Sequence, residues 1–283
     1  MTPHAAMPVN ELPSGTSIPY LGQGTWHMAE DRARRSTEIA ALRLGLDVGM
    51  TLIDTAEMYA DGAAEELVAA AIAGRRDEVF LVSKVLPRHA TRDGTVKACE
   101  GSLRRLGTDH VDLYLLHWRG HVPLSETIAG FEALMAAGAI GGWGVSNFDV
   151  GDLEELVSLP GGPAVQVNQV LYNLARRGVE YDLLPWCRAR SVPVMAYSPV
   201  EQGRLLGHPA IRGVADRHDA TPAQVALAWV LRDGGVTAVP KAGTPEHVRE
   251  DRAAVSIQLT VDDLQILDDA FPPPVSKRPL AML

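Results

Sequence analysis

The chain has 283 residues, of which 46% are hydrophobic and 22% are charged, and its net charge at pH 7 is −9. This is the composition of an ordinary globular chain, and no stretch approaches the roughly 18 consecutive apolar residues that a membrane span needs. Nucleic-acid binding depends on clustered Lys and Arg residues, so the negative charge argues against a nucleic-acid partner. The one densely basic short run, Arg32 to Arg35, is interpreted as a solvated helix face.

The N-terminal segment MTPHAAMPVNELPSG has neither the basic region nor the apolar core of a signal peptide, so we expect a cytoplasmic protein. The two cysteines, Cys99 and Cys187, lack the paired spacing of a disulfide framework or a zinc site, and we expect no metal centre. A complete (β/α)8 barrel typically takes about 250 residues. We therefore predict that residues 1–283 form a single domain.

Short β-rich runs alternate with longer amphipathic segments along the chain, an order that predicts a parallel sheet covered by helices. Each run is apolar enough to be buried on both faces. The predicted strands, eight in number, are IPYLGQGT, TLIDTA, VFLVSKV, VDLYLLHW, IGGWGVSNF, AVQVNQV, PVMAYSP and GVTAVPKA. Their number and order predict a (β/α)8 TIM barrel.

The segments between the strands carry signals of helix starts and ends. STEIAALRLGLDVG and GTVKACEGSLRRLG end at Gly49 and Gly107, as expected of helix C-caps. Thr221 and Thr244, each followed by proline, predict N-caps. Two pieces fall outside the alternation. VNELPSGTSIP is predicted to be an N-terminal β-hairpin plug, and TVDDLQILDDAF an extra C-terminal helix followed by a Pro-rich tail.

Four residues that can carry out a carbonyl reduction lie at or just past the ends of successive predicted strands: Asp54, Tyr59, Lys84 and His117. Barrels build their active sites at these ends. The Tyr59 phenol, with an ordinary pKa near 10, can give a proton to a carbonyl oxygen. A nearby Lys84 ammonium would lower that pKa, Asp54 would keep Lys84 charged and in place, and His117 would orient the carbonyl.

A structural interpretation of the same residues is available. Asp54 would cap the loop into the next helix, Lys84 would be a paired strand-end charge, and His117 would be a core histidine. Polar groups at the ends of three apolar strands are costly unless they are paired. Their joint occurrence therefore favours a catalytic site.

LIDTAEMY with Asp54 and Tyr59, LVSK with Lys84 and LLHW with His117 together resemble the catalytic tetrad of the aldo-keto reductases. The motifs GQGTW, GVSNF, VNQV, YSP and VPK follow in the family's order, so the resemblance covers nearly the whole chain. TAEMYADG, LLHW and EYDLLPWC look most similar to bacterial members that reduce methylglyoxal and other small 2-oxoaldehydes.

The resemblance implies that a nicotinamide dinucleotide lies across the barrel mouth without a Rossmann domain. GQGTWH agrees, because His27 stands where a GxGxxG fingerprint needs its third glycine. By this resemblance, Ser146, Asn147 and Gln169 hydrogen-bond the carboxamide and Tyr197 stacks on the nicotinamide ring. The pyrophosphate would follow a loop whose composition also suits an ordinary turn: Ser198, Val200, Gln202, Gly203 and Arg204.

Lys241 resembles the family lysine that contacts the 2′-phosphate of NADPH, and Thr244 begins a helix whose N-terminus favours anions. The chain departs from the family at Ala242 and His247, where Ser and Arg are usual, and this leaves the strength of the NADPH preference open. The full predicted cofactor set is Gly24, Thr25, Trp26, Asp54, Ser146, Asn147, Gln169, Tyr197, Ser198, Val200, Gln202, Gly203, Arg204, Lys241, Ala242, Gly243, Thr244, His247, Glu250 and Asp251, with the last two at the adenine edge.

Trp26, Tyr59, His117 and Trp118 are predicted to line the substrate pocket, although both tryptophans could instead pack under the plug. The predicted function is therefore NADPH-dependent reduction of aldehydes or activated ketones, with small 2-oxoaldehydes as substrates, Tyr59 as general acid and a monomer as the working form. One alternative is a non-catalytic NADP-binding regulatory barrel. The other is a metal-dependent barrel hydrolase with the ligands Asp54, Glu57, His117 and His121.

Overall fold

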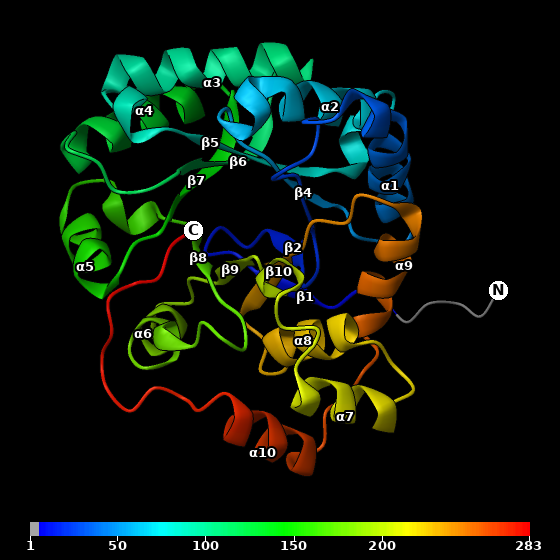
Figure 1. Ribbon diagram of the computed structural model, residues 1–283. Helices are drawn as coiled ribbons and strands as arrows, with labels where there is room; N and C mark the ends of the chain where they lie inside the picture. Colours follow the sequence, from blue (N-terminus) through cyan, green and yellow to red (C-terminus); the bar gives the residue numbers. More distant parts are fainter. Residues whose placement is uncertain (1–5) are drawn as a thin grey trace.

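Eight parallel strands close into a barrel with helices around it (Figure 1). The structure, a computed structural model, describes residues 6–283. The strands pair in chain order, and the first meets the last where Leu21 bridges Ala238 and the Gly22 amide donates to the Ala238 carbonyl at 2.9 Å. The predicted (β/α)8 barrel is confirmed. Its strands are β3 Gln23–Gly24, β4 Leu52–Asp54, β5 Phe80–Val85, β6 Val111–Leu116, β7 Ile140–Ser146, β8 Asn168–Leu171, β9 Val194–Tyr197 and β10 Val236–Val239.

The helices follow the strands and begin and end largely where their capping residues predict. Gly107 takes the left-handed conformation (φ +64°) after α3, and Thr221 and Thr244 accept backbone hydrogen bonds as N-caps of α8 and α9. Two helices, α7 and α8, follow β9, and the strand–helix alternation of the sequence does not predict α7. The helices are α1 Arg35–Asp47, α2 Ala63–Ile72, α3 Arg92–Leu106, α4 Leu124–Ala136, α5 Val150–Ser158, α6 Leu183–Ala189, α7 Pro209–Arg217, α8 Pro222–Leu231, α9 Pro245–Ala254 and α10 Val261–Ala270.

The first barrel strand is shorter than predicted. Ile18 and Pro19, which the prediction placed both in the hairpin and at the start of this strand, belong to β2 (Ser17–Pro19), which pairs antiparallel with β1 (Val9–Glu11). The chain passes from this hairpin into the barrel at Leu21. A shared run of β-forming residues thus hides the boundary between two sheets in the sequence.

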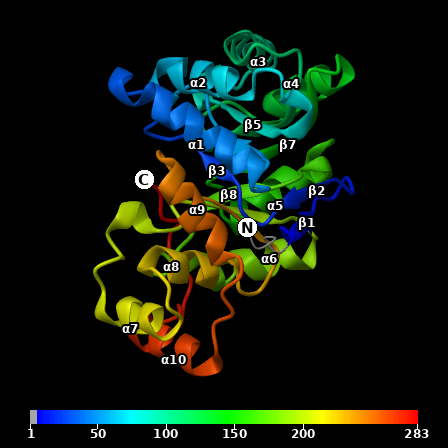
Figure 2. The ribbon, with the colours of Figure 1, turned by 90° about the vertical axis from the view of Figure 1, so that its right-hand side faces the viewer.

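The β1–β2 hairpin closes the barrel at the N-terminal ends of its strands (Figure 2). Leu12 and Ile18 are buried in one apolar cluster with side chains from the barrel strands. The Asn10 side chain donates to Thr237 Oγ1 at 3.0 Å and accepts from the Gly235 amide at 2.9 Å, at the start of β10. The predicted hairpin plug is confirmed, and it leaves the opposite face of the barrel open for a site.

The C-terminal helix α10 lies beside α7, and the tail then runs past α6 to the middle of the barrel mouth (Figure 1). Within residues 6–283, no helix has both the length and the apolar character needed to cross a membrane. Residues 1–5, which begin the segment that lacks a signal-peptide pattern, lie outside the described residues.

Candidate active site

The four predicted catalytic residues meet at the C-terminal ends of the strands. Asp54 is the last residue of β4, Lys84 lies in β5, and His117 directly follows β6. Tyr59 begins the short 3₁₀ helix η2 (Tyr59–Gly62) in the loop after β4. Parallel pairing of β4, β5 and β6 brings these chain-distant side chains to one point.

Lys84 is completely buried and uses its ammonium group to join the site. Its Nζ donates to Asp54 Oδ2 at 2.8 Å, to the Thr55 carbonyl at 2.9 Å and to Tyr59 Oη at 3.1 Å. Burial alone would lower the pKa of Lys84, but Asp54 and then Tyr59 outweigh it, so the net pKa is raised. The lysine therefore remains charged, and the interaction predicted between these residues is present.

Tyr59 is held by a loop with an unusual backbone. Ala60 and Asp61 adopt φ values of 47° and 52°, and Gly62 follows at φ +91°, where an added Cβ would lie 2.6 Å from Arg105 Cδ. This left-handed run turns the chain sharply directly after the tyrosine. Backbone strain concentrated beside Tyr59 is consistent with a functional site.

The pKa of the Tyr59 phenol is raised above its ordinary value, contrary to the sequence expectation. Burial is the largest cause and raises the pKa, whereas Lys84 lowers it, as expected, through its charge and its hydrogen bond. The nearby Asp54 carboxylate raises it again. The sequence shows that Lys84 is near Tyr59 but not how deeply the phenol is buried. It therefore predicts that Lys84 lowers the pKa and does not predict the net shift. At neutral pH the phenol is protonated and able to donate.

His117 is held as a neutral ring. Burial, followed by the charge of Lys84, lowers its pKa to about 2. The ring lies edge-on to Tyr59, with centroids 5.8 Å apart, and its Nδ1 is buried without a hydrogen-bond partner. A proton on Nδ1 would have no acceptor, so we assign the proton of the neutral ring to Nε2. Nε2 is then the donor that a carbonyl oxygen would meet.

A hollow of about 190 Å³ lies directly over these residues. It contains all of the predicted substrate-pocket residues, Trp26, Tyr59, His117 and Trp118. Both tryptophans line this hollow rather than packing under the plug, which lies at the other end of the barrel. Three further apolar residues of its wall were not predicted: Met58, which lies inside the LIDTAEMY motif, and Met282 and Leu283, which belong to no motif.

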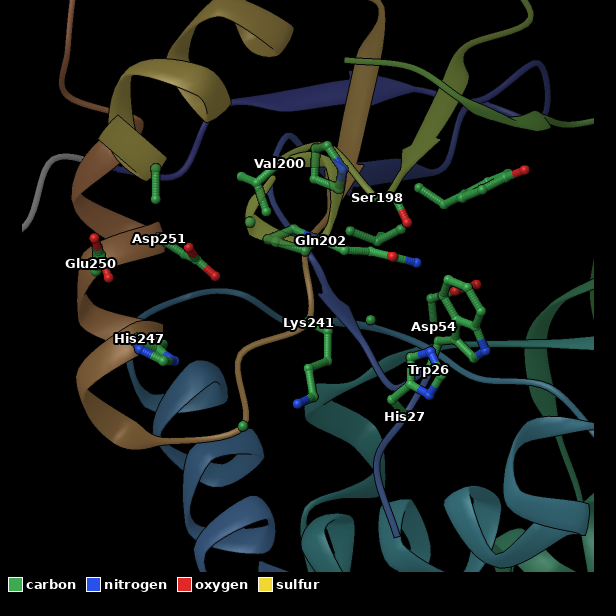
Figure 3. A pocket seen from close by; sticks show the side chains of 18 of the residues that line it. Trp26, His27, Asp54, Ser198, Val200, Gln202, Lys241, His247, Glu250 and Asp251 are labelled. Atoms are coloured by element: carbon green, nitrogen blue, oxygen red, sulfur yellow. The ribbon is translucent and has the colours of Figure 1, made fainter. Parts of the chain in front are cut away.

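A larger cleft of about 420 Å³ adjoins this hollow and shares Trp26, Tyr59 and Tyr197 with it. Figure 3 shows side chains that line the cleft. Thirteen of the predicted cofactor residues line it: Gly24, Trp26, Asp54, Tyr197, Ser198, Val200, Gln202, Gly203, Lys241, Gly243, His247, Glu250 and Asp251. Residues that line it without having been predicted are His27, Arg34, Pro199, Leu206, Ala223, Val239 and Pro240; Tyr59, predicted as catalytic, lines it as well.

The remaining predicted cofactor residues lie elsewhere. Ser146, Asn147 and Gln169 line the smaller hollow. The other four predicted residues line neither cavity, because each is engaged elsewhere. Thr25 is buried and bonds the Asp54 carbonyl, Arg204 is exposed and paired with Glu201 at 3.2 Å, Ala242 is in the core, and Thr244 caps α9.

Asn147 and Gln169 bring amide groups to the floor of the smaller hollow. Asn147, at φ 59°, donates to the His117 carbonyl at 3.1 Å and accepts from Tyr197 Oη at 3.0 Å. Gln169 donates from Nε2 to Asp54 Oδ1 at 2.9 Å. These bonds tie the Asn147 amide to Tyr197 and to the His117 backbone, and the Gln169 amide to the Lys84 network.

The loop after β9 is shaped by a buried acid that the sequence did not reveal. Ser198, Glu201, Gln202 and Gly203 all have positive φ values, from 47° to 83°. Glu201 is buried and accepts hydrogen bonds from Asn173 Nδ2 at 2.8 Å and from two arginines. This pairing fixes a strained loop of which Ser198, Gln202 and Gly203 line the cleft.

Asp251 gives the cleft a neutral polar group. Burial, and secondarily the charge of Glu250, raises the pKa of Asp251 to about 8. At pH 7 its carboxyl group is therefore largely protonated and can both donate and accept at the cleft wall.

The residues of the alternative metal site do not form a ligand set. Both oxygens of Asp54 are bonded to Lys84 or Gln169, and Glu57 Oε1 accepts from the Leu86 amide at 2.7 Å and contacts His89 Nδ1 at 3.0 Å. Among residues 6–283, no group of three or more His, Cys, Asp or Glu side chains is arranged to hold a metal ion. The geometry gives that alternative no support.

Comparison with known proteins agrees with this geometry. Residues 20–271 match the sequence model of the Aldo/keto reductase family. The chain is 52% identical over 272 residues to methylglyoxal reductase YeaE of Escherichia coli K12, a match that covers 94% of this chain and 96% of the relative.

Two crystal structures from Klebsiella pneumoniae are similar along almost their entire length. An aldo-keto reductase in complex with NADPH superposes with a TM-score of 0.96 at 50% identity, covering 99% of this chain and 100% of the other. An aldo/keto reductase in complex with NADP and acetate gives 0.95 at 51% identity, covering 97% and 99%.

The buried ion pair leads to a prediction about stability. Asp54→Asn should lower the free energy of unfolding by about 3–5 kcal/mol, because it leaves the buried Lys84 ammonium without its counter-charge. Urea denaturation measures this difference. Adding Lys84→Met to that variant should restore part of the loss.

Asp61→Asn is the matched control, because Asp61 is an exposed acid in the same loop and Asn tolerates its left-handed backbone. Its effect should stay within about 0.5 kcal/mol. A loss below about 1 kcal/mol for Asp54→Asn would show that the pair does not hold the site together.

Proposed function

Because the chain belongs to the aldo/keto reductase family, we propose that it reduces aldehydes and activated ketones to alcohols with NADPH, and that small 2-oxoaldehydes such as methylglyoxal are its preferred substrates. One observation carries the proposal. The buried Lys84 ammonium joins Asp54 to the Tyr59 phenol where the substrate-sized hollow meets the larger cleft. A proton donor thus stands between a place for a small carbonyl and a place for a dinucleotide.

The residues of the cleft fit a nicotinamide dinucleotide. Gly24 has no room for a side chain, because a Cβ there would lie 2.6 Å from the Val239 carbonyl oxygen, and this keeps the wall flat. Lys241 supplies positive charge, and the left-handed loop after β9 lines the cleft with Ser198, Gln202 and Gly203. NADPH, which the K. pneumoniae relative binds, supplies hydride to a carbonyl carbon when bound.

The proposed roles of the cofactor residues follow from their positions. Ser146, Asn147 and Gln169 would hold the carboxamide, and Tyr197 would lie against the nicotinamide ring. The cofactor's anionic end would extend along the cleft toward Lys241. Support comes from the continuity of the two hollows, which share the ring of Tyr197.

Tyr59 is proposed as the general acid. Its phenolic proton would pass to the carbonyl oxygen, which becomes the hydroxyl group of the product alcohol, and the charge left on the phenolate would face the Lys84 ammonium 3.1 Å away. The neutral His117 would donate from Nε2 to the same oxygen and orient it. A protonated His117 would add a second cation beside Lys84, and its low pKa prevents this.

The smaller hollow supports a small, electron-poor substrate. Trp26, Met58, Trp118 and Met282 give it apolar walls, and the polar groups gather at its floor. A sugar aldehyde would place several hydroxyl groups against these walls without partners, which is costly. E. coli YeaE is named as a methylglyoxal reductase. We also retain a single domain, a monomer and a cytoplasmic location as predictions.

Replacing the proposed acid tests the mechanism. Tyr59→Phe should bind NADPH as the wild type does and reduce methylglyoxal about 10²–10⁴-fold more slowly, the usual contribution of a positioned acid. Stopped-flow absorbance of NADPH and fluorescence titration measure the two quantities separately. Tyr181→Phe, at an exposed position in the turn before α6, is the control and should leave both unchanged. Wild-type turnover in Tyr59→Phe would exclude the mechanism, and a wild type that binds NADPH without turnover would favour the regulatory-barrel alternative.

A carbonyl panel tests the substrate class. At a fixed NADPH concentration, methylglyoxal and glyoxal should be reduced with at least about tenfold higher kcat/KM than glucose or xylose, because a mismatch of roughly 1.4 kcal/mol already gives that ratio. The sugar concentrations are corrected for their open-chain fraction. A strong preference for the sugars would reject the 2-oxoaldehyde assignment and leave the reductase function intact.

A further inference from the structure

Two cationic side chains from separate elements approach one another at the cleft. Lys241 follows β10, and Arg34 ends the 3₁₀ helix η1 (Arg32–Arg34) that leads into α1. Both line the cleft, and Figure 3 shows Lys241 between Trp26 on one side and His247 on α9 on the other. Arg34 is exposed, as the interpretation of the basic run as a solvated face expects, and the structure adds that it borders the cleft.

The two charges meet over Gly243. A Cβ built on this glycine would lie 2.9 Å from Arg34 Nη2 and 3.2 Å from Lys241 Nζ. The absence of a side chain at Gly243 therefore leaves the space into which both cationic groups point. A guanidinium and an ammonium so close together repel each other unless an anion lies between them.

No protein anion takes that place. Among residues 6–283, neither Arg34 nor Lys241 has a side-chain hydrogen bond or an ion pair. The acids that face Lys241 are engaged elsewhere: Glu30 Oε1 contacts His27 Nδ1 at 2.8 Å, and Glu38 accepts from the Ala29 amide at 3.0 Å. Burial first, and then the charge of Arg34, lowers the pKa of Lys241, as expected for two cations without a counter-ion.

We propose that Arg34 and Lys241 together clamp the 2′-phosphate of NADPH, so that Arg34 is a specificity-determining residue for the phosphorylated cofactor. This inference rests on the proposed function. A phosphate monoester carries close to two negative charges, and the planar guanidinium can meet two of its oxygens while the ammonium meets a third. The N-terminus of α9, capped by Thr244, begins directly beside the pair and adds a favourable dipole.

The clamp changes what is expected of Lys241. A single lysine would carry the whole preference for NADPH over NADH, whereas two cations on separate elements divide it. The 2′-phosphate would also join the start of α1 to the start of α9, which pack against each other along the barrel. NADH, which lacks the phosphate, would leave the two cations facing each other unneutralised.

Four proteins test the clamp: the wild type, Arg34→Ala, Lys241→Ala and the double variant. Tryptophan fluorescence titrations with NADPH and with NADH give Kd values that do not depend on turnover. Each single variant should weaken NADPH binding roughly 10- to 100-fold, as expected for loss of a charge-assisted hydrogen bond to phosphate. NADH binding should change less than about twofold, because neither cation meets a partner on NADH.

Arg32→Ala is the matched control, because Arg32 is an exposed arginine of the same 3₁₀ helix that does not line the cleft. It should leave both Kd values unchanged. Arg34→Lys should recover part of the lost affinity, since it keeps the charge and loses the planar fork. Arg34 is exposed and bonds no other side chain, so these variants should fold as the wild type does.

Binding of adenosine 2′,5′-bisphosphate, with 5′-AMP as its control, isolates the phosphate from the nicotinamide. Calorimetry should show that Arg34→Ala weakens the bisphosphate and not the monophosphate. If Arg34→Ala and Arg32→Ala affect NADPH equally, or if Arg34→Ala weakens NADPH and NADH alike, the clamp is wrong while the reductase function stands. A wild type that binds neither cofactor would overturn the proposed function itself.

Discussion

The buried charge of Lys84 is the constraint on which the rest of the site depends. An ammonium group inside a barrel is tolerated only when its hydrogen bonds are filled, and here Asp54, the Thr55 carbonyl and Tyr59 fill them. The same group adds to the effect of burial that lowers the pKa of His117, and it opposes the effect of burial that raises the pKa of the Tyr59 phenol. Burial is the larger cause at both side chains that would face a substrate carbonyl, and the one cation acts on both of them as well.

The barrel holds the Lys84 ammonium in a fixed position beside two cavities, the small hollow and the larger cleft. The hairpin plug closes the opposite end of the barrel, so the buried strands open only toward the loops that follow them. Tyr59 and Tyr197 stand between the small hollow and the larger cleft. The loop that carries Gln202 is held in a left-handed conformation by the buried acid Glu201. Binding spaces are thus built from strained loops on a rigid sheet, as is general for barrel enzymes.

Much of this arrangement could be predicted from the sequence, and the exceptions have physical reasons. Strand ends share one face of a barrel, so Asp54, Lys84 and His117 are predictable from their strands alone. Arg34 is not, because its role depends on how α1 packs beside α9. The net pKa of Tyr59 depends on burial, which the sequence does not show. Helix α7 is a second helix after β9, so the alternation of strands and helices does not predict it. The local sequence pattern predicts the helices and strands, whereas the role of Arg34 and the pKa of Tyr59 depend on how those elements pack together.

The central claim is that the charge of Lys84 acts on the proton of Tyr59, and one measurement tests it most directly. The alkaline limb of kcat for methylglyoxal reduction, at saturating NADPH, reports loss of the phenolic proton. Since Lys84 lowers the pKa of Tyr59, Lys84→Met should move that limb to higher pH while lowering kcat on its plateau. An alkaline limb at the same pH in both proteins, or at lower pH in the variant, would contradict the account.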